Sequence, residues 1–297
     1  MDRDILRYER AVAALPAHLR RAALVLTPEE RAAVEEVRLR TGREMTVLFP
    51  QGERGCGVKV EQKDLEMLCD LASEFSRYAA METLRQGYLT LQGGCRVGFC
   101  GTAVIKEGAA VNLRDISSAA IRIAREKRGI ADDLLPQLFQ NGVFQSTVIL
   151  SPPGGGKTTL LRELVRRLSV GGLRIGLADE RGEIAAVRQG IPQLDVGPRT
   201  DVMDGCPKAE AVLMLLRCMN PQVIAVDEVT AEEDLYAMTA AANCGVSLLA
   251  TIHAESVAEL MRKPLYANLL QAGVFRMAVR LRKEGGTHLR EVEELPC

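Results

Sequence analysis

The sequence predicts an α/β protein of two domains, the second built around a mainly parallel sheet. In the second half of the chain, short apolar runs alternate with segments of helical periodicity, which is typical of parallel strands covered by helices on both faces. The chain has 297 residues, enough for two domains of ordinary size. We expect a smaller mixed α/β domain at residues 1–127, a linker and leading helix at 128–145, and the main domain at 146–297.

The first domain mixes predicted helices and strands. The string Thr27-Pro28-Glu29-Glu30 is a helix start signal, and the alternation of Glu36–Arg40 is typical of a strand. Apolar side chains recur at helical spacing over Asp64–Gln86, with Asp64 as the expected helix cap. Three short runs between residues 88 and 105 predict an antiparallel meander, and Ala120–Arg125 is the last predicted strand of this domain.

The second domain contains five predicted strands separated by helical stretches. In open α/β sheets the ligand binds at the carboxyl ends of the strands. Polar clusters follow four of these strands, so we expect those clusters to converge on one edge of the sheet. The strands are Thr147 to Leu150, Arg174 to Ala178, Val223 to Val226, Ser247 to Thr251 and Arg276 to Leu281.

A glycine-rich loop follows the first of these strands. The string Ser151-Pro152-Pro153-Gly154-Gly155-Gly156-Lys157-Thr158 lies between an apolar run and a helical pattern that begins at Thr159. Consecutive glycines let backbone N–H groups point at phosphates, which also lie at the positive end of the next helix. Lys157 supplies positive charge, and Thr158 a hydroxyl suited to Mg²⁺. An ordinary glycine-rich turn is the alternative; the strand, the helix and the Lys-Thr pair favour ATP binding by residues 151–159.

The motif usually begins with glycine, so Ser151 must have a negative φ.

A second signal is the acidic end of the strand Val223–Val226. We expect Asp227 to hold Mg²⁺ through water and Glu228 to polarise the attacking water. A solvated acidic turn would explain these two carboxylates on their own, but the glycine-rich loop favours a joint site.

Further polar residues are candidates for the same site. His253 ends an apolar strand, where a γ-phosphate-sensing role is favoured over a structural histidine. Glu180 either helps to order water or Mg²⁺ or lies in a solvated turn. Arg199 either reaches a phosphate or a neighbouring subunit, or is a surface arginine. We expect Arg122 and Arg125 on one face of a strand. The residues alone favour an ordinary solvated face over contact with nucleotide.

Composition argues against several other classes of protein. The net charge is −1, and the chain has no Trp, six Phe and five Tyr, so neither a basic nucleic-acid surface nor a base-stacking platform is expected. Eight cysteines without a Cys-x-x-Cys pair and only three histidines indicate a reducing cytoplasm rather than a metal site. No window reaches the roughly 18 apolar residues that span a bilayer, so we expect any membrane association to be peripheral.

Longer strings resemble the stage III sporulation protein AA family, whose members are ATPases of the mother cell in endospore-forming bacteria. The resemblance runs from about Glu36 to Arg282. It is carried by strings such as Gly93-Gly94-Cys95-Arg96-Val97-Gly98, Ile121-Arg122-Ile123-Ala124-Arg125-Glu126, Asp195-Val196-Gly197-Pro198-Arg199-Thr200-Asp201-Val202 and Ala250-Thr251-Ile252-His253.

The catalytic domain of that family is similar to the hexameric ATPases of secretion and type IV pilus machines. The resemblance therefore implies a hexameric ring of RecA-like P-loop domains, an acidic box at Asp179–Glu183 and a histidine box at His253. It also favours contact of Arg122 or Arg125 with nucleotide.

The resemblance further implies a Mg²⁺-dependent ATPase that energises a membrane channel between mother cell and forespore. Its implied partners are small integral membrane proteins, and its implied location is the mother-cell cytoplasm, at the face of the membrane surrounding the forespore. A nucleotide-gated assembly scaffold with little turnover is the alternative, because Val229-Thr230-Ala231 follows Glu228 where the family has Ile-Gly. A nucleic-acid translocase is disfavoured by the charge balance and the scarce aromatics.

Overall fold

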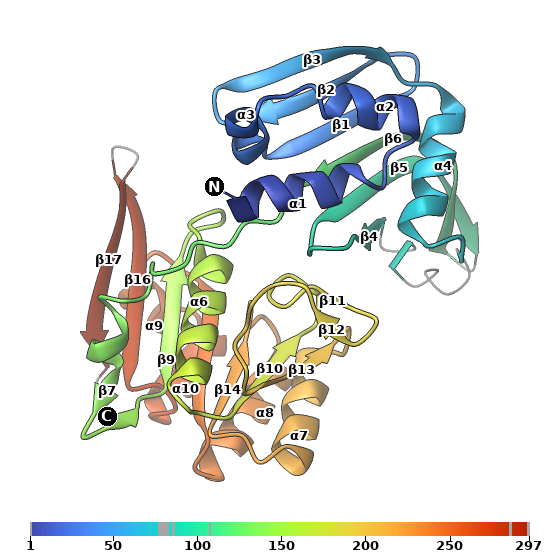
Figure 1. The fold of residues 1–297 in the computed structure, drawn as a ribbon. Coiled ribbons are helices and arrows are strands. Elements are labelled where there is room, and N and C mark those ends of the chain that lie inside the picture. Colours follow the sequence, from blue (N-terminus) through green and yellow to red (C-terminus); the bar gives the residue numbers. More distant parts are fainter. Residues whose placement is uncertain (1, 77–82, 85–86, 107, 285–286, 296–297) are drawn as a thin grey trace. The chain divides into compact units, whose positions relative to one another are not determined.

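The chain forms two compact units in a computed structural model that describes residues 2–76, 83–84, 87–106, 108–284 and 287–295 (Figure 1). The first unit comprises residues 1–125 and 186–193, and the second comprises 126–185 and 194–297. The segment Ala186–Gln193 thus joins the first unit, although the chain on both sides of it belongs to the second. The expected boundaries near residues 127 and 146 did not anticipate this segment.

The first unit is built on an antiparallel sheet of six strands in the order β3-β2-β1-β6-β5-β4. The predicted meander differs in one respect, because two of its three strands are one continuous strand, β5. A register shift lies between Cys100 and Thr102, and a Cβ on Gly101 would meet the Arg114 carbonyl oxygen at 2.6 Å. Only glycine fits this irregular pairing. The strands are β1 (Glu36–Arg40), β2 (Glu44–Phe49), β3 (Gly52–Lys59), β4 (Tyr88–Thr90), β5 (Arg96–Lys106) and β6 (Ala109–Arg122).

Four helices whose bounds lie in the described residues contribute to this unit. The capping box predicted at the start of α3 is present, since Thr27 and Glu30 exchange hydrogen bonds between side chain and backbone. Residues of the helices and the sheet share one buried core that includes Tyr8, Leu19 and Leu65. The helices are α1 (Asp2–Val12), α2 (Ala17–Ala23), α3 (Pro28–Ala33) and α4 (Gln62–Ala72).

The helix predicted over Asp64–Gln86 is wrong in its length and its cap. α4 ends at Ala72, and Glu74 and Phe75 follow with φ of 52° and 58°, which a right-handed helix excludes. Residues 77–82 and 85–86 of the predicted helix lie outside the described residues. Asp64 is inside the helix, where its carboxylate accepts the Glu61 N–H at 2.8 Å.

The second unit contains the predicted parallel sheet. Its order is β13-β10-β14-β15-β9-β16-β17, and every pairing is parallel except that of the edge strand β17 with β16. All five predicted strands of this domain are present, so the α/β prediction with a mainly parallel sheet is confirmed. The strands are β9 (Thr147–Ser151), β10 (Ile175–Asp179), β13 (Thr200–Asp204), β14 (Val223–Val226), β15 (Ser247–His253), β16 (Met277–Glu284) and β17 (Thr287–Glu294).

Helices cover this sheet on both faces. The connection from β9 through α6 (Lys157–Val170) to β10 runs along the sheet in the opposite direction to the later connections that contain helices, so right-handed crossovers place α6 on the other face. Accordingly, one core cluster contains residues of the later helices and none of α6. Within the described parts of the chain, no helix is long and apolar enough to cross a membrane. The later helices are α7 (Lys208–Cys218), α8 (Glu232–Asn243), α9 (Val257–Arg262) and α10 (Pro264–Gln271).

The leading helix expected within residues 128–145 is absent as an α-helix. This stretch instead forms turns, a 3₁₀ helix, η1 (Leu135–Leu138), and a hairpin of β7 (Phe139–Gln140) and β8 (Val143–Phe144). Pro136 has no N–H to donate within a helix. Asn141 and Gly142 have φ of 51° and 77°, as the two central residues of a type I′ hairpin turn require.

Burial on α6 predicts the effect of shortening its side chains. Leu164 is fully buried, whereas Val170 on the same helix is 60% exposed. We expect Leu164→Ala to lower the free energy of unfolding by about 2–5 kcal/mol, because it leaves a cavity. Val170→Ala should change it by less than about 0.5 kcal/mol. Urea unfolding of the full chain, followed by circular dichroism, measures both; equal effects would contradict the packing of α6.

Candidate functional site

The glycine-rich loop connects β9 to α6. Gly154 and Gly156 have φ of 73° and 92°, a backbone region that favours glycine. At Gly155 a Cβ would lie 1.7 Å from the Ser151 hydroxyl oxygen, so only glycine fits beside this serine. Ser151 ends β9 in extended conformation and donates its hydroxyl to the Pro152 carbonyl at 2.9 Å. The loop thus leads into the N-terminus of α6, where unpaired N–H groups favour an anion.

Lys157, the first residue of α6, is folded back under the loop. Its Nζ donates to the carbonyl oxygens of Ser151 at 3.0 Å and Pro152 at 3.1 Å, and lies 2.9 Å from Nδ1 of His253. Burial lowers the pKa of Lys157, and the nearby carboxylates oppose this effect. The ammonium group is therefore held by weak, neutral acceptors that an anionic ligand can replace.

Asp227 joins the loop to the acidic strand. Its Oδ2 accepts the Thr158 hydroxyl at 2.9 Å, and its Oδ1 accepts the Thr251 hydroxyl at 2.5 Å. Burial raises the pKa of Asp227, while these two hydrogen bonds lower it. The Thr251 hydroxyl also accepts the Glu228 N–H at 2.8 Å, so one threonine positions both carboxylate residues.

The hydrogen bonds of Thr251 to Asp227 and Glu228 were not predicted from the sequence. The signal for them is the register of the parallel pair β14 and β15, in which Val226 lies opposite Ala250. The next residues, Asp227 and Thr251, are therefore neighbours. A hydroxyl residue within an otherwise apolar strand, next to the acidic strand, could have revealed this contact.

Glu228 has both carboxylate oxygens engaged. Oε1 lies 3.1 Å from Nε2 of His253, and Oε2 accepts from Arg181 at 2.8 Å. A His253 tautomer protonated at Nε2 satisfies Glu228 and leaves Nδ1 to accept from Lys157. Glu228 also has a φ of 50°, an uncommon conformation for a residue with a side chain and one that clusters at functional sites. Arg181 is a second contact that the sequence analysis did not identify.

The donor set around Asp227 fits a magnesium ion bound together with a nucleotide. The Asp227 carboxylate and the Thr158 hydroxyl are hard oxygen ligands, which Mg²⁺ prefers. Across the described ranges, no group of three or more His, Cys, Asp or Glu side chains gathers as a metal site would require. These two protein oxygens would therefore hold the ion only with phosphate oxygens and water completing its coordination.

Asp179, the last residue of β10, organises the loop that follows it. Its buried carboxylate accepts the N–H groups of Glu183 at 2.9 Å, Ile184 at 3.1 Å and Ala185 at 2.8 Å. Burial raises the pKa of Asp179, and these backbone hydrogen bonds oppose the rise. Arg162 of α6 donates to the Ile184 carbonyl at 2.6 Å. Residues 179–185 therefore form a fixed loop, here called the Asp179 loop.

Glu180 lies in the same narrow crevice as Asp227 and Glu228. Its carboxylate accepts from Lys208 at 2.7 Å, and Lys208 is only 9% exposed. The structure thus brings the predicted residue Glu180 to the site. There its negative charge is paired with the positive charge of the buried Lys208.

Arg199 is not part of this cluster. Arg199 donates to the Gly172 carbonyl at 2.7 Å. Gly172 follows the C-terminus of α6, about 20 Å along the helix from the glycine-rich loop at 1.5 Å per residue. Contact of Arg199 with nucleotide therefore stays a prediction for a neighbouring subunit. In the first unit β6 ends at Arg122, and Arg125 lies three residues beyond it, so the prediction that both arginines share one face of a strand is wrong. Arg125 donates to the Val34 carbonyl at 2.6 Å, and contact of either arginine with nucleotide stays a prediction.

A cavity of about 190 Å³ adjoins the glycine-rich loop within the second unit. Gly155, Gly156 and Thr159 form one wall, and contact of Thr159 with a nucleotide stays a prediction. Apolar side chains and two cations complete the lining, in a combination that suits a flat, mainly apolar group such as a base: Ile130, Leu160, Leu281, Lys127 and Arg290.

Comparison with known proteins gives the family. A family model described as sporulation stage III, protein AA matches residues 7–292. The chain belongs to this family. Stage III sporulation protein AA of Bacillus subtilis is 38% identical over 281 residues, which cover 92% of this chain and 90% of that protein. The resemblance predicted from the sequence strings is confirmed.

Solved structures give the fold. The Legionella pneumophila ATPase DotB matches with a TM-score of 0.62 over 95% of this chain and 82% of that chain, at 16% identity. The pilus retraction motor PilT, crystallised with ADP, matches with a TM-score of 0.58 over 89% of this chain and 80% of that chain, also at 16% identity. The chain therefore has the α/β fold of secretion and pilus ATPases.

The bridging role of Thr251 can be tested against a second buried threonine. Thr251→Val removes a hydrogen bond from Asp227 and leaves the Glu228 N–H without its acceptor. We expect a loss of about 1–3 kcal/mol in the free energy of unfolding and a further rise in the pKa of Asp227. Carboxyl NMR titration and urea unfolding measure these two effects.

Thr147→Val is the matched control, because Thr147 is equally buried and its hydroxyl donates only to the Gln145 carbonyl, at 2.7 Å. The control should leave the titration of Asp227 unchanged. If Thr251→Val also left it unchanged, the hydroxyl would not be stabilising the Asp227 carboxylate.

Proposed function

We propose that the chain is a Mg²⁺-dependent ATPase with a RecA-like P-loop domain. The observation that carries this proposal is the 2.9 Å hydrogen bond between the Thr158 hydroxyl and Asp227, which joins residues 69 positions apart in the chain. An ordinary glycine-rich turn or a solvated acidic turn would not require this contact. Family membership and the fold shared with secretion and pilus ATPases support the same activity.

In the proposed reaction, the N–H groups of residues 154–158 and the Lys157 ammonium bind the phosphates of ATP. Lys157 exchanges its carbonyl partners for phosphate oxygens. Thr158 and Asp227 hold Mg²⁺, which neutralises charge on the phosphates when bound. Glu228 accepts a proton from the attacking water while the water oxygen bonds to the γ-phosphorus and the bond from that phosphorus to the β–γ bridging oxygen breaks, which leaves ADP and inorganic phosphate. His253, between Lys157 and Glu228, responds to the γ-phosphate, and the cavity beside Thr159 receives the base.

We further propose that the protein acts as a homo-oligomer, a hexameric ring, in the mother-cell cytoplasm during sporulation. It would bind at the cytoplasmic face of the membrane around the forespore through small integral membrane proteins, and energise assembly of their channel or transport through it. Arg122, Arg125 and Arg199 are the candidates for contacts with nucleotide bound to a neighbouring subunit. Arginines supplied in this way raise rates by about 10³ to 10⁵ in related chemistry.

One observation favours a second candidate, a nucleotide-gated scaffold with little turnover. Glu228 is held by both His253 and Arg181, so one lone pair of each carboxylate oxygen is already occupied and the two contacts restrict how the side chain can turn toward a water. Under this alternative, ATP binding holds partners together and hydrolysis is incidental. Phosphate release measured with and without the membrane partner separates the two candidates, since the scaffold stays slow in both conditions.

Substitution of the proposed base separates binding from hydrolysis. Glu228→Gln keeps the shape of the side chain but cannot take the proton, so ATP should still bind while turnover falls by about 10² to 10⁴. Isothermal titration calorimetry and steady-state phosphate release measure these two quantities. Glu233→Gln, which removes an exposed carboxylate from α8, is the control and should retain activity. Unchanged turnover in Glu228→Gln would reject Glu228 as the base.

Assembly should control the rate. If arginines act between subunits, the activity per molecule should rise steeply as the protein concentration passes the assembly threshold. Phosphate release across a dilution series, with mass measured by light scattering at each concentration, makes this test. An activity per molecule that is the same in monomer and assembly would remove the ring from the proposal.

A further inference from the structure

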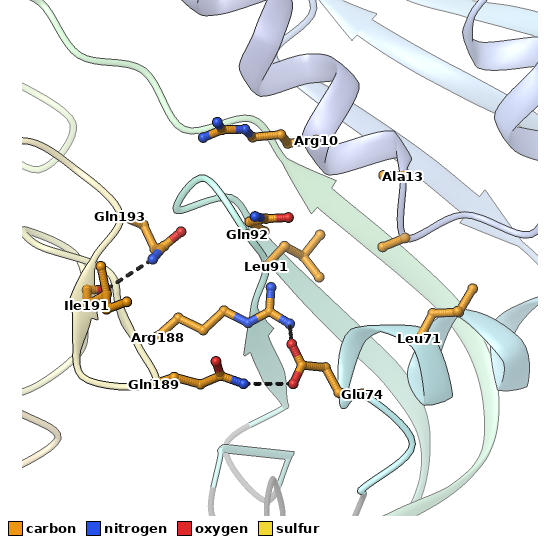
Figure 2. A pocket seen from close by; sticks show the side chains of 11 residues that line it. Arg10, Ala13, Leu71, Glu74, Leu91, Gln92, Arg188, Gln189, Ile191 and Gln193 are labelled. Carbon is orange, nitrogen blue, oxygen red and sulfur yellow. Dashed lines mark hydrogen bonds and ion pairs between the residues drawn. The ribbon is translucent and has the colours of Figure 1, made fainter.

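A cavity of about 400 Å³ lies wholly within the first unit, away from the residues discussed above (Figure 2). Its walls come from the end of α1, the end of α4, the turn between β4 and β5, and the hairpin of β11 (Val187–Arg188) and β12 (Ile191–Pro192). This volume is within the range of sites for small ligands, which is about 300–1,000 Å³.

Several polar groups of the cavity are used to hold the hairpin. Glu74 at the end of α4 accepts from Arg188 and, at 2.8 Å, from the Gln189 amide (Figure 2). On the other side, the Gln193 amide oxygen accepts the Gly93 N–H at 2.9 Å. These contacts close one wall and neutralise the Glu74 carboxylate.

Two polar groups of the lining remain available to a ligand. Among the described residues, the Arg10 guanidinium and the Gln92 amide have no hydrogen-bond or ion-pair partner, and both residues are exposed. The Arg10 stem packs across the turn, since a Cβ on Gly93 would lie 3.2 Å from its Cδ. Figure 2 shows Arg10 and Gln92 at neighbouring positions along the cavity.

These groups define the chemistry of the occupant. Because Arg188 balances Glu74, Arg10 leaves one net positive charge, and its planar guanidinium matches a carboxylate. The Gln92 amide can donate to the same group. Leu71, Leu91 and Ile191 supply apolar surface around these donors. A carboxylate on a small apolar body satisfies all of them.

The hairpin that forms one wall continues directly into the Asp179 loop of the second unit. Ala185 donates its N–H to Asp179 at 2.8 Å, and the next residue, Ala186, begins the segment that packs in the first unit. Gln189 and Gly190 close the hairpin with φ of 50° and 75°, a tight type I′ turn. The cavity wall and the Asp179 loop are therefore contiguous in the sequence.

We propose that this cavity binds a carboxylate carried on a small apolar body, and that its occupancy is transmitted through Ala186–Gln193 to the Asp179 loop. The binding step is independent of the proposed ATPase function; only its effect on turnover rests on that function. The carboxylate comes either from an acidic side chain of a partner protein or from a free carboxylic acid.

Three probes identify the ligand chemistry by NMR titration of the nucleotide-free full chain. N-acetyl-leucyl-glutamic acid amide carries the carboxylate on a peptide, its glutamine analogue lacks the charge, and butyrate is a free acid. The glutamic acid peptide should shift signals of cavity residues, and the glutamine analogue should bind at least about tenfold more weakly. Tighter binding of the peptide than of butyrate assigns the source to a protein side chain, and the reverse assigns it to a free acid. Equal binding of the charged and neutral peptides overturns the proposal.

Variants locate the site. Arg10→Gln should weaken binding of the charged peptide by about tenfold or more, because it removes the charged donor. Arg3→Gln is the matched control, since Arg3 is exposed on the same helix and outside the cavity lining, and binding should be unchanged. An Arg10→Gln protein that binds as tightly as the wild type overturns the assignment.

Hydrogen exchange tests transmission without any need for ATP hydrolysis. Binding of the charged peptide should slow amide exchange at Ile184 and Ala185, whose N–H groups bond to Asp179. Glu74→Gln weakens the hold on Arg188 and leaves its charge unbalanced, so it should bind the charged peptide at least as tightly as the wild type but reduce this protection. If wild-type exchange at these amides is unaffected at saturation, the transmission step is wrong even though the cavity binds. Failure of ATP turnover would leave both results standing.

Discussion

The site depends on the hydrogen bonds that two hydroxyl groups give to Asp227. One hydroxyl comes from the first turn of α6 and the other from the end of β15, so a single carboxylate joins the phosphate loop, the acidic strand and the strand between them. A buried carboxylate is costly unless its oxygens are paired. The two threonines meet this requirement and fix the distance between the loop and the acidic strand.

The charged groups of Lys157 and Glu228 are also held by partners within the protein. Lys157 is bound by carbonyl groups and a neutral imidazole, and Glu228 by His253 and an arginine. The carbonyl and imidazole contacts of Lys157 are weaker than the contact that a polyphosphate would offer, whereas Glu228 and Arg181 form a charge-assisted pair. Ligand binding at this site therefore amounts to an exchange of partners among groups already in position, with little cost for ordering them.

Sequence patterns predicted the parallel sheet, the phosphate loop and the acidic strand because each of these depends on contiguous residues. Thr251 and Arg181 were missed because their roles arise from the pairing of strands and loops far apart in the chain. The helix over Asp64–Gln86 was overestimated because apolar spacing continues to Phe75, a residue that is 72% exposed. Periodicity does not distinguish a buried apolar side chain from an exposed one. The crossing of Ala186–Gln193 into the first unit left no local signal at all.

That crossing has a consequence for how the protein can be dissected. A fragment ending at residue 125 would lack the hairpin partner of Glu74, and a fragment starting at residue 126 would carry the hairpin with nothing to pack against. The buried core of the first unit lies entirely between Tyr8 and Ile123, so it is the cavity wall, and not this core, that the first fragment would lack. During synthesis, the N-terminal half must therefore wait for the ribosome to add Ala186–Gln193 before its last wall can close.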